Sequence, residues 1–78
     1  MITINKNTSK INGLGYSAYF KLIESRKQEK IEIIFTKGKL ELLTEEIERI
    51  NTYDYGLNII KKDNTIIFVN LFNVTQII

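Results

Sequence analysis

The stretch Lys30–Leu43, KIEIIFTKGKLELL, decides the class of fold. Its first half, KIEIIFT, is rich in β-branched and aromatic residues, which is typical of a β-strand. Lys37–Gly38 then predicts a tight turn, because glycine tolerates the positive φ angles that hairpin turns use. KLELL follows as the returning strand. The stretch therefore predicts an antiparallel hairpin in the middle of the chain.

Two more strand-like stretches follow this hairpin. Gly56–Asn70, GLNIIKKDNTIIFVN, predicts a second hairpin whose turn contains Asp63–Asn64, since both residues favour turns. The last segment, NVTQII at 73–78, is also strand-like. Between the hairpins, LTEEIERIN at 43–51 fits either a helical turn capped by Thr44 or a bent strand with a bulge. The sequence leaves both structures open for this segment.

One amphipathic helix precedes the strands. Residues 17–30 predict it, because Ser17 stands at an N-cap position and the apolar residues around it recur at helical spacing. Residues 1–16 form an arm and a loop, in which MITI is a short strand or an ordered arm. The apolar side chains that share one helical face, and are expected to pack on the strands, are Tyr16, Tyr19, Phe20 and Ile23.

These elements fit a single domain, 1–78. One helix and about five short strands are too little for a large open sheet, whereas a strongly bent, nearly closed barrel buries the apolar face economically. The prediction is a mainly β domain with one N-terminal helix at 17–30 and a small, strongly bent SH3-like barrel of about five strands at 31–78. A small α+β sandwich is the alternative.

The composition excludes several chemistries. Cysteine and histidine are absent, which removes disulfides, thiolate zinc sites and the commonest general base. No nucleophile–base pair, phosphate loop or metal-ligand spacing occurs. Glu45, Glu46 and Glu48 are typical of a solvated face. The sequence therefore predicts a protein that is not an enzyme and that holds no metal and no cofactor.

The N-terminal residues are polar and contain no apolar signal segment. The longest unbroken apolar run, IIFV, is far short of a membrane span. We therefore expect a soluble, cytoplasmic protein with no membrane partner.

The charge is split between the two halves of the chain. Residues 1–39 carry eight Lys and Arg against three Glu, a net +5, and residues 40–78 carry three Lys and Arg against six acidic residues, a net −3. Such a split can steer a polyanion to one face, although small domains also scatter their charges in this way.

The run Ile66–Val69, IIFV, has no polar alternation, so both faces of this strand favour burial. A domain of this size covers one face easily. A second copy of the chain would cover the other face and pair the open strand edge, and the helix is the alternative cover. The sequence thus predicts a homo-oligomer whose interface consists of Ile66, Ile67, Phe68 and Val69.

The stretch Tyr53–Ile60, YDYGLNII, precedes the second hairpin. Tyr53 and Tyr55 fall on the same side of an extended chain, where they either stack on bases or close the end of a barrel. Asp54 and Asn58 suit an ordinary turn. They also suit a loop that contacts RNA.

Three stretches resemble the Sm/Lsm family, which includes bacterial Hfq. RKQEKIEIIFTKGKLEL at 26–42 looks like the helix end, first strand, glycine turn and second strand of that family. DYGLN at 54–58 is similar to the Asp-x-x-hydrophobic-Asn element of the first Sm motif, and FVNLFNVTQI at 68–77 to the second motif. The resemblance covers roughly residues 17–78 and implies a ring-forming barrel that binds single-stranded U- or A-rich RNA.

By matched position, the resemblance implies that Asn58 contacts a base and that Asp54 orders its loop. The chain departs from the family in the second motif. Asn70 and Leu71 stand where the family has an Arg-Gly pair, and Leu71 and Phe72 where Hfq has Lys-His. The residues expected to contact RNA are Asp54, Tyr55, Asn58, Asn70 and, on the basic helix, Lys27.

The alternative function is a non-enzymatic module for protein interaction or self-assembly, encoded on a mobile element and without nucleic-acid binding. The missing Arg-Gly and Lys-His pairs and the net charge of only +2 favour this alternative. The basic N-terminal half and the spacing of Asp54 and Asn58 favour RNA. The expected partners are therefore a second copy of the chain and either single-stranded RNA or a partner protein.

Overall fold

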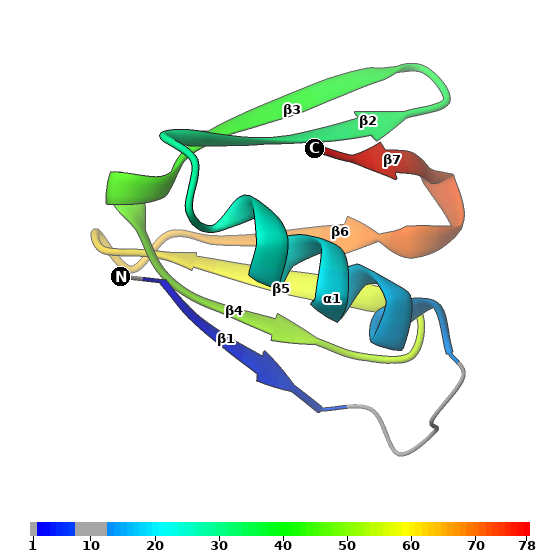
Figure 1. The fold of residues 1–78 in the computed structure, drawn as a ribbon, viewed down its shortest axis with the longest axis horizontal. Coiled ribbons are helices and arrows are strands. Elements are labelled where there is room, and N and C mark those ends of the chain that lie inside the picture. The colour runs from blue at the N-terminus through cyan, green and yellow to red at the C-terminus, as the bar shows by residue number, and fades with distance from the viewer. Residues whose placement is uncertain (1, 8–12) are drawn as a thin grey trace.

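The computed structural model describes residues 2–7 and 13–78, which form one helix and seven strands in two sheets (Figure 1). The mainly β class with one helix is therefore confirmed. The elements are β1 (Thr3–Lys6), α1 (Leu14–Ser25), β2 (Lys30–Phe35), β3 (Gly38–Leu43), the 3₁₀ turn η1 (Thr44–Glu46), β4 (Ile47–Thr52), β5 (Gly56–Lys61), β6 (Ile66–Asn70), the 3₁₀ turn η2 (Leu71–Asn73) and β7 (Val74–Ile77).

The first sheet has the strand order β1-β4-β5-β6, in which β1 runs parallel to β4 and the other neighbours are antiparallel. The second sheet has the order β3-β2-β7 and is antiparallel throughout. The chain crosses between the sheets through η1 and again through η2. Helix α1 contacts strands of both sheets (Figure 1). Within the described residues no closed barrel is present, so the expected barrel of about five strands is not confirmed.

For the segment 43–51 the sequence left a helical turn and a bent strand open as alternatives. It forms η1 and then β4, so a helical turn and a strand both occur. Thr44 does not cap the turn with its side chain. Its hydroxyl instead donates to the carbonyls of Gln28 and Glu29, at 2.9 Å each. Thr44 therefore ties η1 to the segment that leads from α1 into β2.

The two predicted hairpins are both present, but their turns use different chemistry. Gly38 is the first residue of β3, paired with Phe35, and its φ angle is not positive. Among the described residues only Asn64 has a positive φ, 71°. Beside it, the Asp63 carboxylate accepts a hydrogen bond from the Thr65 N–H at 2.9 Å. The second turn therefore confirms the prediction, whereas the positive φ expected of the first glycine is absent.

Helix α1 begins and ends earlier than the predicted helix at 17–30. It starts at Leu14 after Gly13, so Ser17 is not the N-cap. A stripe of small residues and one leucine faces the sheets, and its buried members are Gly15, Ala18, Leu22 and Ser25.

Phe20, which we expected in the core, is 49% exposed. Its ring makes edge contacts with Tyr16 and Tyr19, with centroids 4.9 and 5.4 Å away. The reason is steric: small residues let the helix lie close to the sheets, so the Phe20 ring lies beside the contact and not in it. Tyr19 and Ile23, in contrast, pack partly buried against the core as expected.

Strand β6 buries one face and exposes the other. Val69 is 2% exposed and Ile67 packs against the core. Ile66 and Phe68 point the other way and are 63% and 65% exposed. The second apolar face of this run is therefore left bare by the helix. The buried core comprises Ile2, Ile4, Ala18, Leu22, Ile31, Ile33, Leu42, Ile47, Ile50, Leu57, Ile59, Val69, Leu71 and Ile77.

Candidate binding site: an aromatic hollow

The loop between β4 and β5 lies against η2 at one end of the first sheet. The Tyr53 N–H donates to the Gly56 carbonyl at 2.8 Å, which closes the loop. The Leu71 N–H donates to the Tyr55 carbonyl at 2.9 Å, which links the loop to η2. Two segments that are separate in the sequence are thus held together by backbone hydrogen bonds.

A hollow of about 490 Å³ lies where these segments meet the end of β6. We call it the aromatic hollow. Its lining residues are Asn7, Tyr53, Asp54, Tyr55, Gly56, Phe68, Asn70 and Phe72. The four aromatic side chains among them are between 38% and 66% exposed. Exposed rings that gather on one surface are typical of binding sites.

Two of the rings form a stacked pair. The centroids of Tyr55 and Phe72 are 5.2 Å apart and their planes differ by 15°. The side-chain oxygen of Asn70 accepts a hydrogen bond from the Phe72 N–H at 3.0 Å and so caps η2. Asn70 therefore fixes the start of η2, and η2 places Phe72 against Tyr55.

Asp54 is the single charged residue among the described residues of the lining. One of its carboxylate oxygens, Oδ1, is buried and accepts no hydrogen bond from the described residues. Its backbone carbonyl accepts the N–H of Gly15 in the first turn of α1, at 3.0 Å. The N-terminus of a helix favours a negative charge nearby, so the start of α1 stabilises this carboxylate.

The structure brings some of the predicted RNA-contact residues together and leaves others apart. Asp54, Tyr55 and Asn70 all line the hollow. Asn58 does not, because it lies on the exposed face of β5, in register with Phe68. Lys27 follows the C-terminal end of α1, whereas the hollow adjoins the N-terminal end of this 12-residue helix, roughly 18 Å away along the axis.

Phe68 belongs both to the predicted oligomer interface and to the lining of the hollow. The two sites that the sequence treated separately therefore meet at one ring. Phe72 was not predicted to line a site. In the sequence, Phe72 was noted only because it stands where the family has a cationic residue. Its stacking with Tyr55 could not be predicted, because it depends on a contact between segments that are distant in the sequence.

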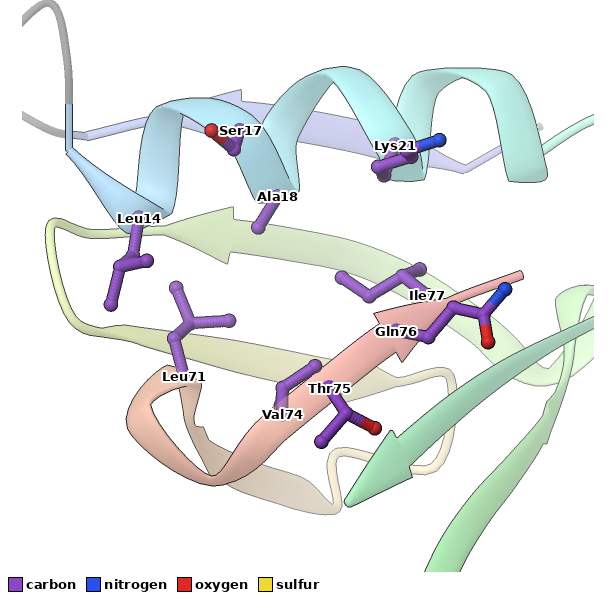
Figure 2. A pocket seen from close by; sticks show the side chains of 9 residues that line it. All are labelled: Leu14, Ser17, Ala18, Lys21, Leu71, Val74, Thr75, Gln76 and Ile77. Carbon is purple, nitrogen blue, oxygen red and sulfur yellow. The ribbon is translucent and has the colours of Figure 1, made fainter. Parts of the chain in front are cut away.

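A second concave surface lies between α1 and β7 (Figure 2). It is an apolar groove of about 220 Å³. Leu14 and Ala18 extend from the helix toward Leu71 and Val74 in the close view. Among its described lining residues Lys21 is the single charge, and none of them marks a class of ligand. The groove therefore offers apolar contact without a chemical signature.

Some acidic residues outside the hollow, such as Glu41 and Glu46, belong to ion pairs at the surface. Lys39 and Glu41 are 2.9 Å apart on β3. Their hydrogen bond raises the pKa of Lys39 and lowers the pKa of Glu41. Glu46 is 3.3 Å from Lys61. Within the described residues, no three acidic groups converge as a metal site would require.

No protein-family model, curated protein or solved structure matches the chain. The resemblance to the Sm/Lsm family therefore stays a prediction from the sequence. Among the described residues, no helix is both long enough and apolar enough to cross a membrane.

Proposed function

We propose that the chain is a non-enzymatic interaction module, a strongly bent SH3-like small barrel that self-assembles along β6 and takes its ligand in the aromatic hollow. The observation that carries the proposal is the gathering of four exposed aromatic side chains at one hollow, beside an edge strand. A cluster of exposed aromatic rings promotes aggregation of a monomeric domain unless a binding partner covers it.

The order of the strands supports an SH3-like barrel that is open at two corners. Starting from β7, the hydrogen-bonded order of the second sheet runs to β2 and from β2 to β3. The chain then turns through η1 into β4, β5 and β6, and η2 returns it to β7. The strands thus follow one another in a closed circuit, and the two 3₁₀ turns occupy the corners where a small barrel bends.

Two unpaired strand edges support self-assembly. Among the described strands, β6 pairs only with β5, and β7 only with β2. An edge of this kind is a template for pairing with another chain. Joining β6 of one copy to β7 of the next would use a different edge on each side, which is the head-to-tail contact that generates a ring when the rotation closes. The exposed Ile66 and Phe68 lie beside this contact.

Light scattering tests the assembly. The molar mass should be a multiple of the 9.1 kDa chain. Ile66→Lys should lower it, because a lysine beside the contact disrupts apolar packing and brings a charge without a partner into it. Gln28→Lys adds the same charge at an exposed position outside β6, between α1 and β2, and should leave the mass unchanged. A monomer at high micromolar concentration would contradict the assembly.

Single-stranded RNA is the second candidate ligand, which the resemblance to the Sm/Lsm family suggests. The observation in its favour is the stacked pair of Tyr55 and Phe72, since aromatic faces bind bases by stacking. Fluorescence anisotropy with labelled oligo(U) and oligo(A) at low salt tests it. Phe72→Ala should then weaken binding by about 1–3 kcal/mol. No binding below about 100 micromolar would exclude this candidate, since that is the range of non-specific affinity.

A further inference from the structure

We propose that the aromatic hollow recognises the guanidinium group of an arginine side chain on a partner polypeptide. The inference rests on the proposed function, because it takes the hollow as the ligand site of the module. It names the chemical class of ligand that the hollow would accept.

The first argument is the sign of the charge. Among the described residues no Lys or Arg lines the hollow, and the one charged residue of the described lining is Asp54. The nearest cation in sequence among the described residues, Lys6, lies over the ring of Tyr16 with its Nζ 4.3 Å from the centroid. It therefore belongs to the helix surface and does not neutralise the carboxylate. At the described lining residues a phosphate would meet a negative charge and no cation, whereas a cationic group would meet its complement.

The second argument is the chemistry of the walls. The faces of aromatic rings attract cations, and a planar guanidinium can stack on such a face while it donates to a carboxylate. Tyr55 and Phe72 already form a parallel stack, to which a third plane can be added. Asp54 supplies the acceptor, since this acidic residue is part of the lining of the hollow. A lysine ammonium lacks the plane, so arginine fits this combination better.

The test compares three labelled peptides by fluorescence anisotropy with the full chain. The first contains four Gly-Gly-Arg repeats, the second has citrulline at each arginine, and the third has lysine there. The arginine peptide should bind most tightly. Citrulline keeps the shape and loses the charge, so its peptide should bind roughly fivefold or more weakly. The lysine peptide should fall between them.

Three variants locate the binding. Asp54→Asn and Phe72→Ala should each weaken the arginine peptide roughly fivefold or more, since each removes one of the two contacts. Asp63→Asn is the matched control, because it makes the same charge change at the exposed tip of the β5–β6 hairpin. Thermal melting checks the fold of each variant. Phe72 is 66% exposed, so its removal should leave the domain folded even if Asp54→Asn does not.

Several outcomes would overturn the inference. Equal binding of the arginine and citrulline peptides would show that the charge is not recognised, and an equal effect of Asp63→Asn would show that only overall charge matters. A third outcome is that the chain binds oligo(U) or oligo(A) but not the arginine peptide, and that Phe72→Ala abolishes this binding. The hollow would then be a ligand site for a nucleic-acid base and not for arginine. Self-assembly is measured separately, by the molar mass. A monomeric chain would contradict the proposed assembly but would not change how the three peptides compare.

Discussion

The ring of Phe68 lies over the backbone of Gly56. A Cβ atom on Gly56 would stand 2.6 Å from Cε1 and 2.7 Å from Cζ of that ring. The two residues are near neighbours on adjacent strands, because Gly56 pairs with Asn70 in the register of β5 and β6. Glycine is therefore needed here for close approach and not for its φ angle, which is not positive.

Gly56→Ala should displace the Phe68 ring and reshape the aromatic hollow. The clash involves the far end of one side chain, so the ring can move and the loss of stability should stay within about 1–3 kcal/mol. Binding in the hollow should fall although the domain stays folded. The measurement is thermal melting combined with ligand titration, and unchanged binding would show that the ring does not shape the site.

Gly15→Ala should destabilise the domain more strongly than Gly56→Ala. A Cβ on Gly15 would overlap the backbone carbonyl of Tyr53, which cannot rotate away. The helix would have to leave the β4–β5 loop, at a cost at the upper end of about 1–3 kcal/mol or above it. Gly38→Ala is the control, since nothing lies within 4 Å of its Cβ. Equal melting temperatures for these two variants would contradict the packing of α1.

Leu22→Ala should cost about 2–5 kcal/mol, because Leu22 is fully buried at 0% exposure. Phe20→Ala should cost far less, since Phe20 is half exposed and contacts mainly Tyr16 and Tyr19. Urea denaturation of both variants measures the difference. A larger loss for Phe20→Ala would place the other face of the helix against the sheets.

Ile67→Lys and Ile66→Lys should have different effects although the residues are adjacent. Ile67 packs against the core, so a lysine there buries an ammonium and should unfold or strongly destabilise the domain. Ile66 is exposed, and its replacement should leave the monomer folded. Circular dichroism and melting curves separate the two. Similar melting of both variants would mean that β6 is rotated from its described orientation.

The exposed pair of Lys39 and Glu41 should give a small pH dependence. The hydrogen bond from Lys39 lowers the pKa of Glu41 below its usual value of 4.5. The stability that this ion pair contributes is therefore present at pH values above 4.5, and it is lost as the pH falls through the lowered pKa of Glu41. Glu41→Gln should therefore be slightly less stable than the natural chain near pH 6, and the two should converge near pH 2. Urea midpoints across this range measure it, and a gap that widens toward low pH would reverse the assigned sign.

Local patterns predicted much of the fold. The composition of KIEIIFT and the turn residues Asp63 and Asn64 located both hairpins, because these signals act over a few residues. The helix was placed three residues late. Its start is set by the contact between the Gly15 N–H and the Asp54 carbonyl, which joins residues distant in the sequence. The exposure of Phe20 depends likewise on how closely the helix approaches the sheets.

The candidate site was predicted only in part, because it too depends on contacts between residues distant in the sequence. Asp54, Tyr55 and Asn70 were selected from short motifs, and they do meet. Asn58 and Lys27 were selected with them but lie outside the hollow, since strand register and helix length place them elsewhere. The loss of cationic residues from the second motif was visible in the sequence. The stack that Phe72 forms in the same place was not.

Titration of the full chain with the arginine peptide, followed in aromatic and methyl carbon–proton NMR spectra, tests the central claim most directly. The claim is that the ligand site is the aromatic hollow. It predicts that signals of Tyr53, Phe68 and Phe72 shift progressively, while the methyl signals of Leu14 and Val74 in the groove between α1 and β7 stay in place. Shifts confined to Leu14 and Val74, with the three rings unchanged, would contradict it.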